Sequence, residues 1–237
     1  MPEKQVKSRE RVAEHGEVFT AEREVNAMLD LVKNETERIE SRFLEPACGD
    51  GNFLAEILRR KLAVVRKKYG SAQKRQDFEK WSVIAVMNIY GVELLPDNAD
   101  ACRERLFEIW DKAYRENCGT YAGEKCRAAV RFVLERNILC GDALSLKQEN
   151  EEAIIFSEWS FVNETKVKRR DFRLNQMLEG GVPEVQLKIW EDDEETHAYI
   201  PKAQGRIDWV YDEETRAYIP APCKEYPPTD YWRVQYV

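Results

Sequence analysis

FLEPACGDGNFL, residues 43–54, is the stretch of sequence that decides the fold. Residues 42–45 predict a short buried strand, a turn with two glycines follows, and the amphipathic run from Asn52 to Gly70 predicts a long helix. Glycine lets the backbone approach a ligand closely, and the first turn of a helix carries N–H groups that have no partner within the helix. This strand, turn and helix therefore predict a ligand-binding loop.

The charge of that loop limits the kind of ligand it can hold. A glycine turn at a helix N-terminus commonly cradles a phosphate. Here Glu45 and Asp50 would repel a phosphate. A ligand with a cationic centre fits the acidic loop better.

Residues 1–172 alternate helical and strand patterns, which sets them apart from the rest of the chain. Residues 21–32 predict a helix with Thr20 as its N-cap and an apolar face. That face consists of Val25, Met28, Leu29 and Val32. Five segments follow the glycine loop and its helix: helical at 72–87, a strand at 88–94, a helix from Pro96 towards Glu116, a strand from Arg136 to Leu139, and a fourth buried strand at 153–156. Short apolar strands alternating with helices predict an α/β fold with a mostly parallel, doubly wound sheet.

Two further carboxylates stand at strand ends. Glu93 ends the strand predicted at 88–94, where an acid can accept hydrogen bonds from both hydroxyls of a ribose. Asp142 follows the third predicted strand, in the segment GDAL at residues 141–144. Either acid alone is typical of a turn or a cap. Together with the glycine loop, and in this order, they indicate a cofactor site.

The segment EPACGDG, residues 45–51, resembles the E/D-P-A-C-G-x-G loop of the N6-adenine-specific DNA methyltransferases of restriction–modification systems. The resemblance covers residues 15–142 and implies a Rossmann-like methyltransferase core that binds S-adenosylmethionine. The positive ammonium and sulfonium groups of this cofactor would match the negative charge of the acidic loop. By this resemblance Glu45 accepts from the methionine amino group and Asp142 from the adenine amino group. The residues that it assigns to the cofactor are Phe19, Thr20, Glu45, Pro46, Ala47, Cys48, Gly49, Gly51, Glu93, Asp142 and Ala143.

The segment HGEVFT, residues 15–20, resembles the family motif that precedes the first helix and usually ends in Phe-Thr-Pro. Ala21 stands where the proline belongs. Because proline at the first helical position mainly presets φ, we expect its loss to be mild. The resemblance implies that Phe19 and Thr20 lie against the methionine end of the cofactor.

The predicted fourth strand departs from the family pattern. In the family it ends in Asn/Asp/Ser-Pro-Pro-Tyr/Phe, which holds the amino group of a flipped adenine and stacks on its ring. Here EWSF, residues 158–161, stands at that place, without either proline. Glu158 and Phe161 are the candidate catalytic residues, Glu158 as an acceptor for an amino group and Phe161 as the terminal aromatic. The alternative is a strand end with no catalytic role.

A basic cluster follows this strand directly: Lys166, Lys168, Arg169, Arg170 and Arg173. It is either a loop that contacts DNA phosphates or a solvated turn. In the first case, Lys166, Lys168, Arg169 and Arg170 would bind DNA. No segment looks large enough to recognise a target sequence, so we expect a specificity or second methyltransferase subunit as a partner.

Residues 173–237 form a different, strand-rich region that we take as a C-terminal extension of the core at 1–172. It contains an internal repeat, DEETHAYIP at 193–201 and DEETRAYIP at 212–220. Each copy follows an apolar run with a tryptophan, which predicts two β-hairpins. Their aromatic residues form either a binding platform or cross-strand packing.

Bulk composition excludes several classes of protein. The net charge of −7 excludes a generally basic nucleic-acid-binding chain, and no apolar stretch is long enough to span a bilayer. The N-terminus lacks a secretory pattern. Six scattered cysteines without a CxxC pair, and only two histidines, predict reduced thiols in a cytoplasmic protein with no metal site.

The sequence thus predicts an S-adenosylmethionine-dependent adenine-N6 DNA methyltransferase that works with a partner subunit. A non-catalytic cofactor-binding subunit of a DNA-modification or phage-defence complex is the competing hypothesis. Methylation of RNA or protein is a third, because similar loops serve those substrates.

Overall fold

The computed structural model describes residues 6–175, 209–212 and 217–237. Its centre is a parallel sheet of three strands, β1 (Phe43–Glu45), β2 (Ile89–Glu93) and β3 (Ile138–Cys140), in the order β1-β2-β3. The α/β class is therefore confirmed, and the sheet is compatible with a Rossmann-like core.

Each connection between these strands contains two helices. The chain runs from β1 through α4 (Asn52–Tyr69), the short η1 (Ala72–Lys74) and α5 (Arg75–Met87) to β2. It returns through α6 (Pro96–Cys118), η2 (Gly119–Tyr121) and α7 (Glu124–Asn137) to β3. The helices predicted at 52–70, 72–87 and from Pro96 are confirmed, whereas the sequence analysis did not predict α7.

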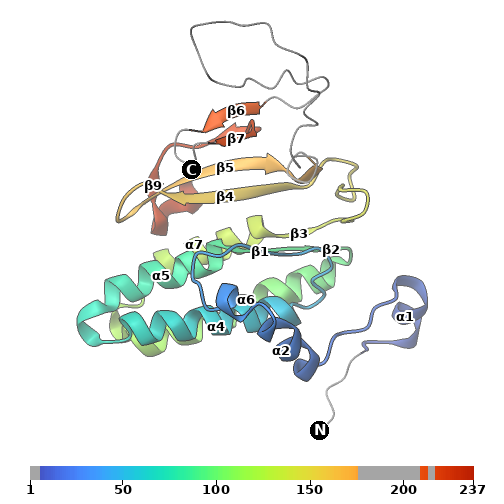
Figure 1. Ribbon diagram of the computed structural model, residues 1–237, viewed down its shortest axis with the longest axis horizontal. Coiled ribbons are helices and arrows are strands. Elements are labelled where there is room, and N and C mark those ends of the chain that lie inside the picture. The colour runs from blue at the N-terminus through green and yellow to red at the C-terminus, as the bar shows by residue number, and fades with distance from the viewer. Residues whose placement is uncertain (1–5, 176–208, 213–216) are drawn as a thin grey trace, which may run out of the picture.

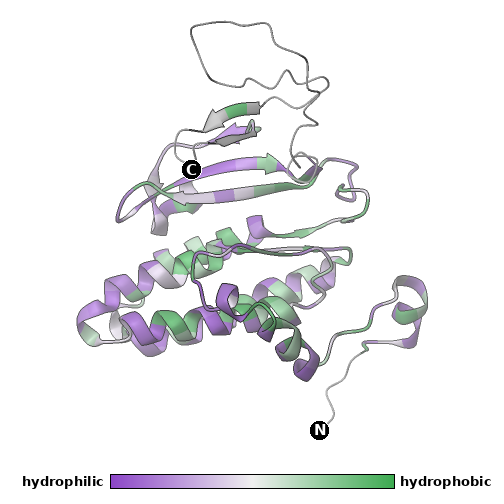
Figure 2. Cartoon of the chain, in the orientation of Figure 1, coloured by the Kyte–Doolittle hydropathy of each residue, from purple (hydrophilic) through white to green (hydrophobic). Residues whose placement is uncertain are grey.

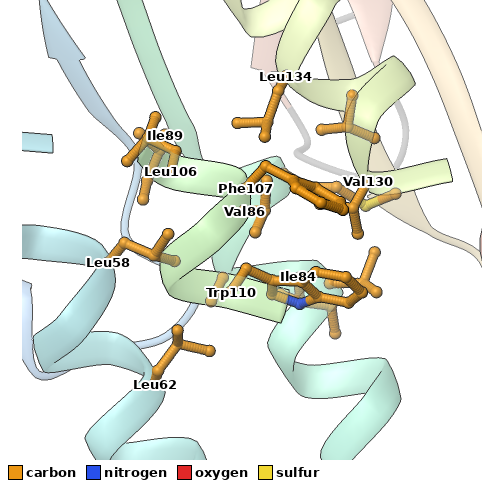
Figure 3. Close-up of a cluster of buried hydrophobic side chains, with 14 of the residues drawn as sticks. Leu58, Leu62, Ile84, Val86, Ile89, Leu106, Phe107, Trp110, Val130 and Leu134 are labelled. Carbon is orange, nitrogen blue, oxygen red and sulfur yellow. The ribbon is translucent and has the colours of Figure 1, made fainter. Parts of the chain in front are cut away.

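These helices share one large apolar core (Figure 3). Leu58 from α4, Val86 from α5, Trp110 from α6 and Leu134 from α7 are all buried in it. The indole Nε1–H of Trp110 donates to the Ser82 hydroxyl at 3.0 Å, so the largest buried ring also has its polar atom paired.

The two faces of β2 belong to different cores. Ile89 belongs to the helix-side core, whereas Tyr90 and Val92 form a second, smaller core with Ile154 and Phe156. Successive residues of a strand point to opposite faces, so the apolar run in β2 requires a cover on both sides of the sheet. Helices cover one face, and a second sheet covers the other (Figure 1).

That second sheet is antiparallel, so the fourth buried strand predicted at 153–156 does not join the parallel sheet. β4 (Ile155–Phe161) pairs antiparallel with β5 (Lys166–Arg173), and β5 also pairs with β8 (Lys224–Glu225) and β9 (Thr229–Asp230). A tight turn explains this pairing, because Asn163 Oδ1 accepts from the N–H groups of Thr165 and Lys166 and returns the chain beside β4.

β4 also runs across the parallel sheet in the reverse direction. Ile154, just before β4, lies against Gly141 at the carboxyl end of β3. Trp159, further along β4, donates from Nε1 to Asn137 Oδ1 at 2.9 Å, just before β3 begins. The far end of β4 therefore lies near the amino ends of the parallel strands.

The first helices flank this body. They are α1 (Arg9–His15), α2 (Glu22–Asp30) and α3 (Lys33–Thr36). The helix predicted at 21–32 is confirmed in shortened form, but its predicted details are partly wrong. Ala21 is the N-cap instead of Thr20, and Met28 and Val32 are exposed while Val25 and Leu29 are buried.

The C-terminal region returns to the core. β6 (Trp209–Asp212) and β7 (Ala217–Pro220) pair antiparallel, which confirms the second predicted hairpin; the first copy of the repeat lies outside the described residues. The final segment, η3 (Tyr231–Tyr236), packs against α7, and the Tyr231 hydroxyl donates to Glu79 at 2.9 Å. The division at residue 172 stays a prediction.

A lysine is buried beside the start of β1. Lys61 of α4 has no exposed surface, and its ammonium donates to the carbonyl oxygen of Ile39 at 2.9 Å and to that of Ser41. Burial lowers the pKa of Lys61 to about 7, although the carboxylates of Glu35 and Glu40 act in the opposite direction.

This lysine predicts a pH-dependent stability. Between its folded pKa of about 7 and the ordinary value of 10.5, the unfolded chain binds a proton that the folded chain lacks. The free energy of unfolding should therefore rise with pH in this window, by at most about 1.4 kcal/mol per pH unit. Urea unfolding at several pH values measures this slope. Lys61→Met should remove that contribution.

The matched control is Lys67→Met, which changes an exposed lysine on the same helix. It should keep the wild-type slope. Equal slopes in Lys61→Met and wild type would show that Lys61 does not titrate in this way.

Candidate functional site

Three loops with acidic residues meet at the carboxyl edge of the parallel sheet. Glu45 and Glu93 are the last residues of β1 and β2, and Asp142 comes two residues after β3. The loops are tied by backbone bonds, because the Cys48 N–H donates to the Val92 carbonyl at 3.0 Å and the Gly141 N–H to the Glu93 carbonyl at 2.9 Å. The predicted loop and both strand-end acids are therefore brought together at one edge, where parallel α/β sheets bind ligands.

The turn after β1 needs its glycines. Gly49 and Gly51 have φ values of 55° and 90°, in the left-handed region. A Cβ at Gly51 would lie 2.7 Å from the Cys102 Sγ, and one at Gly49 would lie 3.1 Å from the Phe19 ring. The turn is thus packed between α6 and the N-terminal segment, which explains why both positions are glycine.

The Glu93 carboxylate is the centre of the site. Its oxygens accept from the Gly49 N–H at 2.8 Å, from the Leu95 N–H at 3.1 Å and from Asn98 Nδ2 at 3.2 Å. Only 8% of Glu93 is exposed. A buried carboxylate with these partners is held in one orientation at the edge, as an acceptor for a ligand's hydroxyl groups would need to be.

The other two acids differ in their surroundings. Burial raises the pKa of Glu45, although its hydrogen bond with the Ala47 backbone acts against this. A cationic group beside Glu45 would compensate for that burial. The pKa of Asp142 is lowered, chiefly by a 2.8 Å hydrogen bond from the Leu144 N–H. Asp142 therefore also stabilises its own turn.

The predicted N-terminal residues Phe19 and Thr20 lie beside the glycine turn and the start of α4. The Thr20 carbonyl accepts from Asn52 Nδ2 at 2.9 Å, and the Phe19 ring lies against Gly49. Pro46 and Ala47 belong to the turn itself, and Ala143 follows Asp142 after β3. All the predicted cofactor residues thus gather around the same edge of the sheet.

Sequence reasoning missed the contribution of α6. Asn98 binds Glu93, Cys102 packs on Gly51, and Arg105 donates to Asn52 Oδ1 at 2.6 Å. The only signal was that α6 begins directly after Glu93. Residues 98, 102 and 105 then follow at helical spacing, which puts them on one face.

Two apolar side chains at this edge were also missed. Leu94 is 53% exposed next to Glu93, and Leu144 is 95% exposed two residues after Asp142. Exposed apolar residues beside fixed carboxylates suit a ligand with a flat apolar ring and polar groups around it.

The cysteine of the loop is a structural thiol. Its pKa is raised strongly, first by a hydrogen bond with the Cys102 thiol and then by burial. A neutral thiol is a poor nucleophile, and the buried Cys48 side chain packs against Gly91 of β2.

The candidate catalytic residues lie elsewhere. Glu158 Oε1 pairs with Arg42 at 2.8 Å, just before β1 begins, and Glu158 Oε2 pairs with Arg170 at 2.6 Å. The ring of Phe161 lies 6.2 Å from that of Tyr231, centroid to centroid. Because Arg42 precedes β1 and Glu45 ends it, the structure does not bring Glu158 and Phe161 to the carboxyl edge where the cofactor residues gather.

The basic cluster is neither a loop nor a solvated turn, which corrects both interpretations. It forms strand β5, which is largely hydrophilic (Figure 2). Arg169 and Arg170 are buried. Four of the five cations pair with carboxylates: Lys166 with Asp230 at 3.0 Å, Lys168 with Glu225 at 3.0 Å, Arg169 with Asp171 at 2.7 Å and Arg170 with Glu158 at 2.6 Å. The fifth, Arg173, is exposed. Their contact with DNA stays a prediction.

Comparison with protein-family models, with curated proteins and with solved structures finds no match. Within the described part of the chain, no group of three or more His, Cys, Asp or Glu side chains could hold a metal ion. None of the helices in the described ranges has both the length and the apolarity to cross a membrane.

The packing of the turn predicts a large effect of Gly51→Ala. Its Cβ would meet Cys102 Sγ at 2.7 Å on a backbone with φ of 90°. We expect a loss of about 2–4 kcal/mol in the free energy of unfolding, measured by denaturant titration.

Gly16→Ala is the matched control, because Gly16 is also left-handed, with φ 64° and ψ 22°, but has no atom within 4 Å of its Cβ position. It should lose only about 1–2 kcal/mol. Adding Cys102→Ala should restore part of the stability lost in Gly51→Ala. If the two glycine variants were equally stable, the close packing of the loop on α6 would be refuted.

Proposed function

We propose that this chain binds S-adenosylmethionine and acts in an adenine-N6 DNA methyltransferase together with a second subunit. The observation that carries this proposal is the fixed Glu93 carboxylate, bonded to the Gly49 N–H beside an acidic glycine loop. It supports a ligand that combines hydroxyl groups with a positive charge.

The residues at the edge fit such a ligand group by group. Glu93 would accept from the ribose hydroxyls, and Glu45 from the ammonium of the methionine part, whose charge offsets the burial that raises the pKa of Glu45. Asp142 would accept from the adenine amino group. Leu94 and Leu144 offer apolar contact to the adenine ring. When bound, the cofactor would supply the methyl group from its sulfonium, whose sulfur would leave as a neutral thioether.

The task of the chain's own residues would be to bind and orient. Holding two reactants in line accounts for a large share of catalysis in a direct displacement. The acceptor nitrogen, N6 of a flipped adenine, must then be held near the carboxyl edge. Glu158 is paired with Arg42 and Arg170 away from that edge. We therefore infer that the second subunit supplies target recognition and part of the adenine pocket.

A second candidate is a non-catalytic cofactor-binding subunit of a DNA-modification or defence complex. The position of Glu158, with both carboxylate oxygens held by guanidinium groups, favours it. In this case binding of S-adenosylmethionine to this subunit would signal to the complex that the cofactor is present, or would stabilise the complex.

Calorimetry with S-adenosylmethionine tests the premise of both candidates. We expect binding in the micromolar range. Glu93→Gln should weaken it roughly 10- to 100-fold, because it removes charge-assisted hydrogen bonds to the ligand.

Glu104→Gln is the control, since Glu104 lies on the outer side of the same α6 and pairs with Arg131. It should bind as the wild type does. No heat of binding at millimolar S-adenosylmethionine, with the chain folded, would rule out both candidates.

Transfer of a labelled methyl group separates the two candidates. We expect methylation of adenine in DNA only when the chain is combined with subunits encoded beside it. Because Glu158 lies away from the edge, Glu158→Gln should keep that activity within about threefold.

Methylation by the chain alone that is lost in Glu158→Gln would assign catalysis to Glu158 and contradict the need for a partner. Glu164→Gln, in the exposed turn after β4, is the control. Cofactor binding without any transfer would favour the non-catalytic subunit. A labelled methyl group found in RNA or protein, and not in DNA, would show that the methyl acceptor is a different one.

A further inference from the structure

The N-terminal segment 7–20, which we call the strap, is fastened across the start of α6. Arg11 reaches Asp97 with Nη1 at 2.7 Å and Nη2 at 3.1 Å, and the Lys7 ammonium lies 3.0 Å from the same carboxylate. In Figure 1, α1 stands apart from the helices that pack under the sheet. Within the described residues, ion pairs therefore supply much of what attaches the first part of the strap.

A chain of hydrogen bonds, partly buried at the strap and buried at Glu93, continues from the strap into the candidate site. Arg11 binds the Glu17 carboxylate at 2.6 and 2.8 Å. Asn98 Nδ2 donates both to Glu17 at 2.6 Å and to Glu93 at 3.2 Å. Asn98 is 1% exposed, so one buried amide joins the strap's carboxylate to the central carboxylate of the site.

The strap also contributes the ring next to the glycine turn. Phe19 lies against Gly49, whose N–H donates to Glu93 at 2.8 Å. The strap therefore contacts the surroundings of Glu93 from two sides, through Asn98 and through Phe19. A group that enters or leaves at Glu93 meets both contacts.

From this geometry we propose that the strap is a closing element of the site, and that Arg11 and Asn98 are positioning residues that couple its closure to occupancy of Glu93. A ligand hydroxyl that binds Glu93 shares this carboxylate with Asn98 and the Gly49 N–H. Release of the ligand then requires the strap to lift from Asp97. The part of this inference that concerns the ligand rests on the function proposed above.

Asp97→Asn tests the fastening without any ligand. Asp97 is about half exposed, so the variant should fold, and the amide keeps the shape while removing the charge. Trypsin can cut the strap after Lys7, Arg9 and Arg11 when it lifts. We expect cleavage there to be about five- to tenfold faster in Asp97→Asn, and wild type to approach that rate as salt is raised.

Asp100→Asn is the matched control, because Asp100 is an exposed acid on the same helix that pairs with Arg103 and not with the strap. It should be cut at the wild-type rate. Arg11→Gln removes the bonds to both Asp97 and Glu17, and also one trypsin site, so only cleavage after Lys7 and Arg9 is compared. At those two sites it should be cut at least as fast as Asp97→Asn. Cleavage at the wild-type rate in both strap variants would overturn the fastening.

The coupling to ligand is tested by the rate of S-adenosylmethionine release in stopped-flow displacement. We expect release to be about tenfold faster in Asp97→Asn and in Arg11→Gln, with a smaller change in the association rate. A general loss of structure would slow association as well, so this split is diagnostic.

Faster trypsin cleavage with an unchanged rate of S-adenosylmethionine release would overturn the coupling. The attachment of the strap to Asp97 would still be supported. If the wild-type chain binds no S-adenosylmethionine, the proposed function and the coupling both fail. The cleavage rates then still decide whether the strap is fastened by Asp97.

Discussion

The hydrogen bond from the Gly49 N–H to the Glu93 carboxylate is the contact on which the arrangement of the site depends. It joins the turn after β1 to the end of β2 at 2.8 Å. The same carboxylate accepts from Leu95 and Asn98, so it also fixes the start of α6. A carboxylate with little access to solvent is stable only when its oxygens accept hydrogen bonds in this way. The glycine turn, the helix and the N-terminal segment are therefore positioned by one buried acid.

The antiparallel hairpin β4–β5 covers the face of the parallel sheet that the helices leave open. Tyr90 and Val92 point away from the helices and need an apolar partner, which Ile154 and Phe156 provide. The Tyr90 hydroxyl donates to the Ser157 carbonyl at 3.1 Å, so the buried ring also has its polar atom paired. Because β4 covers the parallel sheet and does not join it, Glu158 lies away from the carboxyl edge of that sheet.

Local patterns predicted which residues gather at the carboxyl edge of the sheet better than they predicted the topology. The glycine turn, Glu93 and Asp142 lie at strand ends, and the ends of parallel strands share one edge, so sequence order alone brought them together. The path of β4 could not be predicted because a short apolar run such as residues 153–156 fits a parallel or an antiparallel strand equally well. Only the turn at Asn163 and the pairing with β5 decide between them. Asn98 was missed because a polar residue in the first turn of a helix usually has only a local role.

Under the proposed function, the distribution of charge argues for a second subunit that contacts the DNA. A protein that binds DNA alone needs cations that are free to displace the counterions of the phosphates. Here four of the five cations of β5 are engaged with Asp171, Glu158, Glu225 and Asp230, and the fifth, Arg173, is exposed. The carboxyl edge of the parallel sheet is itself lined by acids. With a net charge of −7, the chain would be repelled by a polyanion at long range. An acidic site suits a cationic cofactor and opposes DNA, so the two ligands of the proposed reaction make opposite electrostatic demands. A second subunit that supplies the positive surface would meet the demand that this chain does not.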